Sequence, residues 1–349
     1  MNHPSEQLTA RGISVAFHTR GGTIARMQVQ DGGQTIAPLH HAPWAADDVP
    51  AGAPPHQRWL AGDFFCAPFG DASADAAPLH GWTANADWQG QGGHYRLVRS
   101  VMGAQVEKHL TLHDAHPFIY QRHVFIGGAG GLPVANHAMV HLPQGGRIST
   151  SALRWCETPA TAPETDPARG RSLLAYPARA ALQAFPMADG GTADLGQYPL
   201  GTAHEDFVTA VAAPGLTFGW TAVASVTGYL FLSLRRADRL PLTMFWHSNG
   251  GRHYAPWSSR HACVLGVEEG VGTALMGLAA TENPNPLAAA GQPTALHLGG
   301  QTEVRHIIGA IHWPSGEAVA SITPGPATLT VTGTTGTTRV LPFDDGFLG

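Results

Sequence analysis

The chain has 349 residues, of which 43% are hydrophobic and only 13% are charged, and its formal net charge is −5 at pH 7. This balance gives no electrostatic basis for binding nucleic acid or an anionic membrane surface. With 43 glycines and 27 prolines, the sequence favours many turns and few long helices.

The cysteines and the first residues bear on the cellular compartment. Cys66, Cys156 and Cys263 lie far apart, so they make a poor disulfide framework, and no CxxC pair indicates a zinc site. The N-terminal stretch has no basic region followed by an apolar run, which a signal peptide would need. No run of about 18 or more apolar residues indicates a membrane span. We therefore expect a cytoplasmic protein with reduced thiols.

The first third of the chain reads as antiparallel strands. Residues 13–30 alternate on both sides of Arg20-Gly21-Gly22, which predicts a hairpin. Residues 34–62 are rich in Pro, Ala and His and predict a long surface connection. Residues 94–126 hold three period-2 runs separated by two turn-like stretches, which predicts an antiparallel meander.

The rest of the chain continues in the same way after a long irregular stretch. Residues 157–203 are rich in Ala, Pro, Gly and Thr and predict long loops, with one short helix candidate at 178–185. Strand-like runs follow at 206–213, 217–234, 240–247, 261–268, 272–279, 303–312 and 317–322, and a last hairpin surrounds Gly333–Gly336. Because strands follow one another without alternating helices, we predict an all-β fold, a large antiparallel sandwich with few short helices.

Two segments contain candidate functional side chains, His80 and Glu268. His80 lies in the stretch APLHGWTANADW, where it could be a turn residue, a metal ligand or a proton donor. Glu268 follows the apolar run 264–267, and a carboxylate there needs a partner or a function. Glu269 is its neighbour on the opposite face of a strand, so only one of the two can point into a cleft, and we choose Glu268.

Several segments, in order, resemble the galactose mutarotase (aldose 1-epimerase) family. They are the Gly-pair strand and apolar-Pro-Leu of 21–44, the Pro-Phe-Gly of 64–72, the Leu-His-Gly and tryptophan of 78–88, the strand–turn–strand block of 106–128, the Asn136-His137 pair, and the late glutamate strand of 261–270. No single motif is specific, but the ordered set covers most of the chain.

The resemblance implies one galactose mutarotase-like domain over 1–349, a β-supersandwich with a cleft on its concave face. It also implies interconversion of the α and β anomers of a free sugar. By position, Glu268 would be the base, His137 the proton donor, and His80 a histidine that binds or polarises the sugar. An imidazole exchanges protons at neutral pH, and a partly buried glutamate with a raised pKa can act as a base. Such chemistry needs no metal and no organic cofactor.

The substrate-binding residues are less clearly marked. Residues 69–76 lack the arginine that many members place before the Leu-His-Gly motif, so Arg58 would have to reach in. Ala84 stands where sugar-phosphate epimerases of this fold have an arginine, which argues against a sugar phosphate. Flat apolar faces for stacking on a sugar are offered by Trp82 and also by Trp44, Trp88, Trp246 and Trp257.

The segment 244–261 gathers many polar and aromatic side chains: His247, Asn249, Arg252, His253, Tyr254, Trp257, Arg260 and His261. As a sugar-contact loop it would bond hydroxyl groups through Asn249 and Arg252 and stack Trp257, with His247 nearby. It could equally be a plain surface loop. A metal site at His247 and His253 is the third alternative, although the spacing matches no common zinc pattern.

Three functions remain open from the sequence. The first is the epimerase, acting on a small sugar as a monomer or homodimer, with its carboxylate and imidazole on opposite sides of a sugar-sized space. The second is a sugar-binding protein without catalysis, since the continuation after His137 lacks the aromatic pair typical of the family. The third is a glycoside hydrolase or lyase, for which Asp63, Asp71 and Asp206 are candidate second carboxylates.

Overall fold

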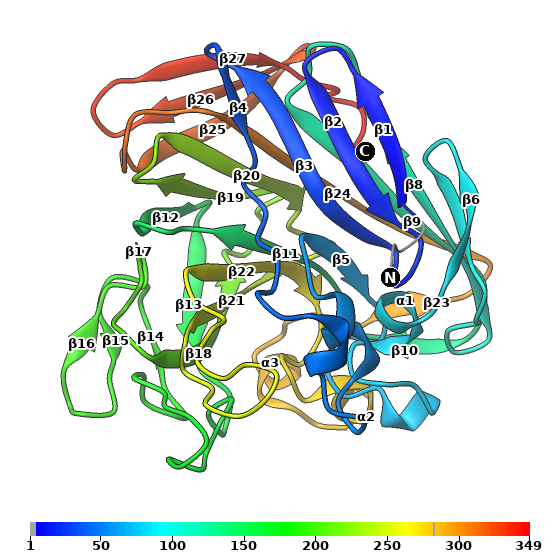
Figure 1. Ribbon diagram of the computed structural model, residues 1–349, viewed down its shortest axis with the longest axis vertical. Helices are drawn as coiled ribbons and strands as arrows, with labels where there is room; N and C mark the ends of the chain where they lie inside the picture. The colour runs from blue at the N-terminus through cyan, green and yellow to red at the C-terminus, as the bar shows by residue number, and fades with distance from the viewer. Residues whose placement is uncertain (1–4, 282) are drawn as a thin grey trace.

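The computed structural model describes residues 5–281 and 283–349, within which an eleven-stranded and a nine-stranded antiparallel sheet pack against each other (Figure 1). The eleven-stranded sheet is called the large sheet and the nine-stranded one the second sheet. This architecture confirms the predicted all-β sandwich with few short helices. None of the helices in the described residues is long and apolar enough to cross a lipid bilayer.

The large sheet holds the strands on which the site is built. Its order is β1 (Ser5–Ala10), β2 (Ile13–His18), β3 (Thr23–Asp31), β5 (Asp63–Cys66), β11 (Val134–His141), β22 (Val264–Val271), β21 (Leu242–Asn249), β18 (His204–Ala212), β13 (Leu153–Glu157) and β14 (Arg179–Ala180), with β4 (Gln34–Ile36) beside β3. Strands distant in the sequence, such as β5 and β11, are therefore neighbours in the middle of this sheet.

The second sheet covers one face of the large sheet. Its order is β17 (Gln197–Tyr198), β12 (Gly146–Thr150), β19 (Phe218–Ser225), β20 (Tyr229–Arg236), β24 (Gln301–His312), β9 (Phe118–Gly127), β8 (Ala104–Thr111), β7 (His94–Leu97) and β6 (Trp88–Gln91). A C-terminal sheet packs on its outer side and consists of β25 (Val319–Gly325), β26 (Thr328–Gly333) and β27 (Thr338–Pro342).

The remaining elements are short. The helices are η1 (Ala46–Asp48), η2 (Pro55–Trp59), η3 (Ser73–Asp75), α1 (Gly81–Asn85), α2 (Gly277–Thr281) and α3 (Pro286–Ala289). Two small strand pairs join β10 (Gly130–Leu132) to β23 (Leu296–Leu298) and β15 (Phe185–Pro186) to β16 (Thr192–Ala193).

The predicted hairpins and the meander are confirmed, and two local predictions are wrong. The segment 178–185 forms β14 and the start of β15 instead of a helix, because proline at 177 and 186 brackets a stretch too short to nucleate one. The segment 272–279 turns away from the sheet and enters α2 instead of forming a strand, and Gly277 takes a positive φ there.

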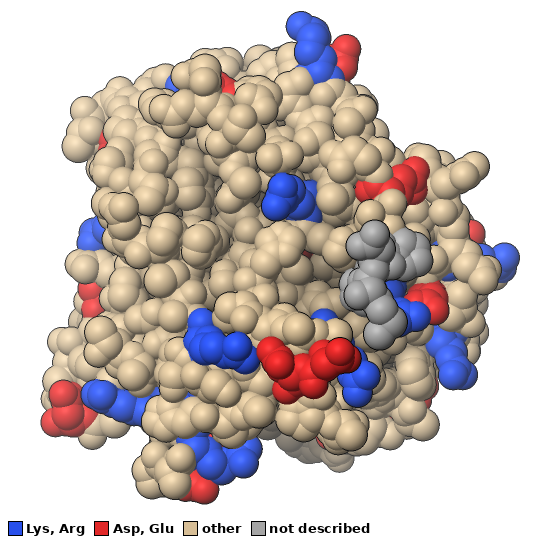
Figure 2. All heavy atoms as spheres, in the orientation of Figure 1, with Lys and Arg blue, Asp and Glu red and all other residues tan. Residues whose placement is uncertain are grey.

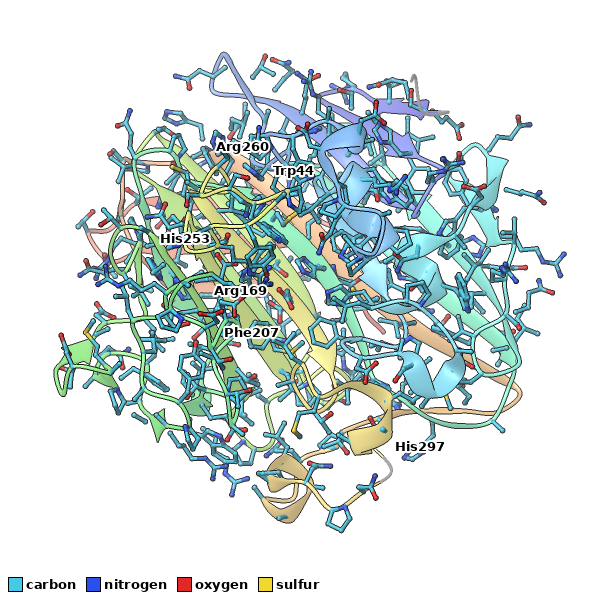
Figure 3. All side chains as sticks on the ribbon, turned by 60° about the horizontal axis from the view of Figure 1, so that its bottom comes forward. Trp44, Arg169, Phe207, His253, Arg260 and His297 are labelled. Atoms are coloured by element: carbon cyan, nitrogen blue, oxygen red, sulfur yellow. The ribbon has the colours of Figure 1, made fainter. Side chains whose placement is uncertain are left out.

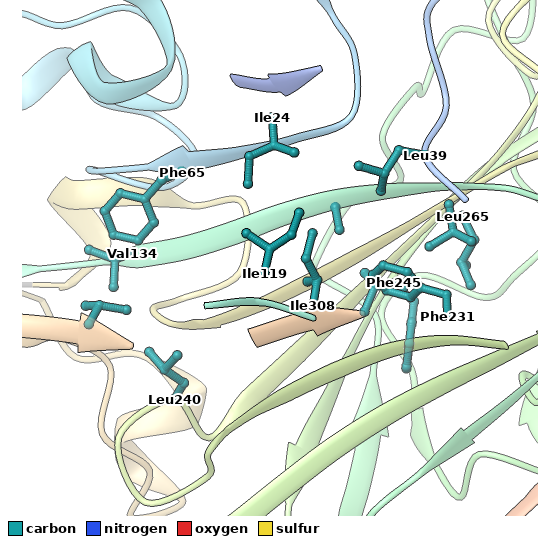
Figure 4. Packing of buried hydrophobic residues seen from close by; sticks show 14 of the residues in the cluster. Ile24, Leu39, Phe65, Ile119, Val134, Phe231, Leu240, Phe245, Leu265 and Ile308 are labelled. Carbon is teal, nitrogen blue, oxygen red and sulfur yellow. The ribbon is translucent and has the colours of Figure 1, made fainter. Parts of the chain in front are cut away.

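Successive side chains along the central strands of the large sheet point alternately to its two faces. Phe245 and Leu265 point toward the second sheet, where they pack in one cluster with Phe231 and Ile308 (Figure 4). Val267 belongs to the same cluster. The residues between them, on the same strands, point to the other face of the large sheet. The period-2 pattern therefore gives that outer face a separate set of side chains.

Glu269 belongs to the sandwich interior. Its carboxylate lies 2.8 Å from the guanidinium of Arg235 and accepts hydrogen bonds at 2.8 Å from the hydroxyls of Thr221 and Thr243. A buried carboxylate that is paired and hydrogen-bonded in this way is a structural group. This leaves Glu268 as the glutamate that faces away from the second sheet.

Lys108 is the only lysine in the sequence, and it is completely buried. Its Nζ donates a hydrogen bond of 2.7 Å to the carbonyl oxygen of Gly22 and lies 5.4 Å from the centre of the Phe17 ring. Burial lowers the pKa of Lys108 to about 8 and raises that of the neighbouring Asp63 to about 6. The surface carries few charges, and on the face in Figure 2 they are scattered.

Candidate active site

His137 and Glu268 are brought together by the register of two neighbouring strands. β11 and β22 pair antiparallel with His137 directly opposite Glu268, so both side chains leave the sheet on the same face. The imidazole Nε2 lies 3.2 Å from the carboxyl Oε1, and both side chains are buried. The two groups are thus in contact side by side, and the expected placement on opposite sides of a sugar-sized space is wrong.

Burial shifts both groups toward their neutral forms. It raises the pKa of Glu268 well above its usual range and lowers the pKa of His137 to about 3. With the carboxyl favoured in its protonated form and the imidazole in its neutral form, the pair holds one exchangeable proton between Oε1 and Nε2. A pair of this kind can take a proton at one atom and release one at the other.

His80 approaches the pair from the loop that follows β5. Its backbone takes the left-handed conformation, with φ at 69°, a strained position for a residue with a side chain. Two hydrogen bonds with Gly70 hold it there: the His80 amide donates to the Gly70 carbonyl at 2.9 Å, and the Gly70 amide donates to His80 Nδ1 at 3.4 Å. The His80 ring centre lies 5.6 Å from that of His137.

Gly81 is required for this local geometry. Its φ is +73°, and a Cβ at this position would overlap the carbonyl oxygen of Ala67. We expect Gly81→Ala to lower the free energy of unfolding by roughly 2–4 kcal/mol, measured by urea denaturation. Gly92→Ala is the matched control, because Gly92 has a similar φ of +64° and open space around its Cβ position. Equal losses in the two variants would contradict the overlap argument.

The three residues line one cavity of about 190 Å³ on the outer face of the large sheet. It is called the site cavity. Its polar lining residues are His56, Gln57, His80, His137, Arg252 and Glu268. Its apolar lining residues are Leu60, Phe64, Leu79, Pro163, Phe207, Trp246, Trp257 and Leu275. Flat aromatic walls together with a few convergent polar groups are typical of a small-molecule site.

Two irregular segments form part of the wall above the strands. Figure 3 shows Arg169 and His253 over the green and yellow strands of the large sheet, near Phe207, which belongs to β18 of that sheet. The His253 amide donates a hydrogen bond of 2.7 Å to the carbonyl oxygen of Arg169, and Gly170 forms a bridge with Arg252. The Pro-rich segment 157–203 and the polar loop 250–261 therefore support each other at the site cavity.

Arg252 is held against the cavity wall by a buried carboxylate and two rings. Its Nε lies 3.6 Å from Glu205 Oε1, and its guanidinium lies 4.5 Å from the centre of the Trp257 ring. Glu205 also accepts hydrogen bonds from the indole of Trp246 and, at 3.0 Å, from the hydroxyl of Ser248. This arrangement places a cation and two indole faces on one side of the cavity.

The substitution Glu205→Gln tests whether the Glu205 carboxylate holds this wall of the cavity in place. The amide would turn at least one N–H toward groups that already donate, so we expect the free energy of unfolding to fall by about 1–3 kcal/mol. Chemical denaturation measures the change, and Glu107→Gln, on the partly exposed side of β8, is the control. A Glu205→Gln protein as stable as the control would show that Glu205 does not organise this wall.

Two of the six predicted substrate-binding residues, Arg252 and Trp257, line the site cavity. Asn249 does not, because its amide is used within the fold, donating to the Gly201 carbonyl at 2.8 Å and accepting from the Cys263 amide at 3.1 Å. His247 also lies elsewhere. It is fully buried behind the sheet, 5.9 Å from the ring of Tyr198.

Arg58 and Trp82 are the other two predictions that the structure places outside the site cavity. Arg58 is exposed, although His56 and Gln57 of the same helix η2 line the cavity. Trp82 is turned away on α1, where the guanidinium of Arg99 lies 4.8 Å from its ring. In each case the short helix turns successive residues in different directions, so the side chain chosen from the sequence lies outside the cavity that its neighbours approach.

Sequence reasoning missed several cavity residues as contacts, chiefly His56, Gln57 and Phe207. Phe207 could have been found by continuing the alternation, since it lies on a central strand directly opposite Trp246. No sequence signal marks His56. Among residues 5–281 and 283–349, no group of three His, Cys, Asp or Glu side chains is arranged to hold a metal ion.

Solved structures with the same architecture carry little sequence similarity. An aldose epimerase homologue from C. elegans superposes with a TM-score of 0.54 at 13% identity, covering 89% of this chain and 100% of its own. A galactose mutarotase related enzyme from Lactobacillus acidophilus gives 0.52 at 11% identity, covering 90% and 99%. The chain has the galactose mutarotase-like fold. No protein-family model and no curated protein matches the sequence.

The galactose mutarotase-like fold also occurs in a different context. A TPR-domain containing protein from Parabacteroides distasonis superposes with a TM-score of 0.52 at 10% identity over 89% of this chain, but over only 47% of its own. At such identities the comparison establishes the fold alone, and function must be argued from the site.

Proposed function

We propose that this protein is an aldose 1-epimerase that interconverts the α and β anomers of a free sugar in the site cavity. The observation that carries the proposal is the contact of 3.2 Å between Nε2 of His137 and Oε1 of Glu268, two buried side chains that line a cavity with aromatic walls. Ring opening of a cyclic sugar needs one proton removed from the anomeric hydroxyl and one delivered to the ring oxygen. Both oxygens are bonded to the same carbon, so an adjacent base and acid suit the reaction.

The proton balance closes within this pair. The step begins when the shared proton of the pair lies on His137 Nε2, which leaves Glu268 ionised. Glu268 then takes the proton of the anomeric hydroxyl while His137 gives the shared proton to the ring oxygen, and the bond between the ring oxygen and the anomeric carbon breaks. Rotation of the open-chain aldehyde exposes its other face. Ring closure with the reverse proton transfers restores both side chains, so no proton is gained or lost in a full cycle.

The cavity lining supports an uncharged sugar as substrate. Of the cavity residues that the structure describes, Arg252 is the only arginine or lysine, and Glu205 already lies 3.6 Å from it. A phosphate group is best held by two or more unpaired N–H donors of arginine or lysine. The three imidazoles of His56, His80 and His137 suit hydroxyl groups, because burial lowers the pKa of each and keeps it neutral.

A hydrolase of glycosidic bonds is less well supported. It would need a second carboxyl group across the cavity from Glu268. The candidates Asp63, Asp71 and Asp206 are absent from the described cavity lining. Asp206 is instead bonded by the Leu173 and Leu174 amides at 3.1 and 3.0 Å and by His204 at 2.8 Å.

Saturation-transfer NMR between the α and β anomeric protons of glucose, galactose and several pentoses tests the proposal. We expect the wild-type protein to accelerate exchange of at least one of these sugars above the rate in buffer. A sugar that binds without faster exchange would favour the non-catalytic sugar-binding alternative. Absence of both binding and exchange across the panel would reject the proposed function.

A further inference from the structure

His56 is a buried imidazole in the wall of the site cavity to which the proposed reaction assigns no role. It lies on η2, and its ring centre is 5.1 Å from that of His80 and 5.9 Å from that of Phe64. The ring is therefore part of the same surface as the reacting pair. What it can do there depends on which of its nitrogens carries the hydrogen.

The orientation of the Asn85 amide answers that question. Its Nδ2 donates hydrogen bonds to the carbonyl oxygens of Leu79 and Gly81, at 2.8 and 2.7 Å. Both partners can only accept, so the NH₂ group must point toward them. The amide oxygen then faces His56, and it accepts a hydrogen bond of 2.8 Å from the His56 backbone amide.

The same oxygen lies 3.3 Å from His56 Nδ1. Because an amide oxygen cannot donate, Nδ1 must carry the hydrogen that completes this contact. Burial lowers the pKa of His56 to about 4, so the ring is neutral at pH 7 and has a single N–H. Its Nε2 is then an unprotonated acceptor, on a ring that lines the site cavity.

His80 is held in the opposite tautomer. The backbone amide of Gly70 donates to His80 Nδ1 at 3.4 Å, so this nitrogen is an acceptor and the hydrogen of the neutral ring is on Nε2. The two neighbouring rings therefore differ: His56 has an acceptor at Nε2 and His80 has a donor. A hydroxyl group donates and accepts at once, and a pair of this kind is complementary to it.

We propose that His56 is a specificity-determining residue that accepts a hydrogen bond from a sugar hydroxyl at Nε2, with Asn85 as the positioning residue that fixes its tautomer. His80 donates to the same hydroxyl or to the adjacent one. This inference rests on the proposed function, since it concerns the substrate of the same cavity. The proposed reaction uses only the anomeric hydroxyl and the ring oxygen. The inference adds that the substrate must also have another hydroxyl group that can bond to His56 and His80.

The tautomers can be measured without any sugar. Long-range ¹⁵N–¹H correlation NMR of the ¹⁵N-labelled full chain at pH 7 distinguishes Nδ1–H from Nε2–H rings. We expect Nδ1–H for His56 and Nε2–H for His80, with the His56 signals assigned by their loss in His56→Gln. In Asn85→Ala, His56 should shift toward the Nε2–H form. A wild-type His56 with Nε2–H, or one unchanged in Asn85→Ala, would overturn the positioning role.

The substrate role is tested with the sugar that exchanges fastest and its monodeoxy analogues. We expect His56→Phe to raise KM roughly tenfold with little change in kcat, and His56→Gln, whose amide oxygen can accept, to recover part of that loss. For the one analogue that lacks the contacted hydroxyl, wild type and His56→Phe should have equal KM. If KM is unchanged in both variants while exchange continues, this inference fails and the proposed function survives.

Discussion

Glu268→Gln and His137→Ala are each expected to slow enzyme-catalysed anomer exchange by about 10²–10⁴-fold. The amide of Gln cannot take up the proton of the anomeric hydroxyl, and alanine cannot deliver one to the ring oxygen. Because the two side chains act as a unit, the double variant should be hardly slower than either single one. Saturation-transfer NMR at matched protein concentration measures all three rates against the rate in buffer.

The controls change the same residue types outside the site cavity. Glu107→Gln on β8 and His94→Ala on β7 should leave the exchange rate unchanged. Circular dichroism confirms that each variant is folded, and sugar binding is followed separately by chemical-shift perturbation. If the Glu268→Gln protein exchanged anomers at the wild-type rate, the assignment of the acid–base pair would be wrong.

Mild acid is expected to unfold the protein between about pH 6 and pH 4.5. Burial holds a set of histidines neutral, with pKa values lowered to about 4 for His56 and to about 3 for His40, His137, His247 and His306. In the unfolded chain these side chains titrate near pH 6.5. Each therefore takes up a proton when the protein unfolds at any pH between those two values.

The sign of the pH dependence follows from these shifts. The stability that each histidine contributes is fully present above pH 6.5, and it is lost as the pH falls toward the folded-state pKa. The loss is about 1.4 kcal/mol per pH unit for each histidine, against a total stability of about 5–15 kcal/mol. Asp63 and Glu268, whose pKa values are raised, act in the opposite direction but are outnumbered.

The measurement is the free energy of unfolding in urea at several pH values from 8 to 5. We expect a steep fall below pH 6.5 and a shallower one in His123→Phe. The His123 ring stacks on Phe65 at 3.8 Å, is buried, and has a pKa held well below its usual value. His94→Phe, at an exposed position, is the control and should keep the wild-type slope. A stability that stays level from pH 7 to pH 5 would refute the argument.

The strands and the faces of their residues could be predicted because alternation is a local property. The apolar run before Glu268 indicates a buried strand, and the period of two places Glu268 and Glu269 on opposite faces of it. The resemblance of ordered segments adds His80 and His137, which are distant in the sequence. Neither argument could reveal the contact of His137 with Glu268, since it depends on the register of β11 against β22.

The other residues that line the cavity are harder to predict because several of them come from loops and one-turn helices. Charge alone points to Arg58, yet η2 turns His56 inward and leaves Arg58 exposed. The polar sequence around His247 suggests a loop, but His247 is the sixth residue of β21 and faces away from the cavity. Arg252 and Trp257 line the cavity, since both follow the end of that strand, where the chain turns over the cavity.

The burial of Lys108 has a practical consequence for labelling. Because it is the only lysine and its Nζ is sealed against the Gly22 carbonyl, the native fold offers acylating reagents no side-chain amine. Unfolding of the sandwich exposes the Lys108 amine. Each unfolded molecule can therefore be acylated once at that side chain, which adds one acyl group to its mass. Peptide mapping after a brief pulse of such a reagent would count unfolded molecules directly. Enzymes that modify lysines on folded surfaces would find none on this protein.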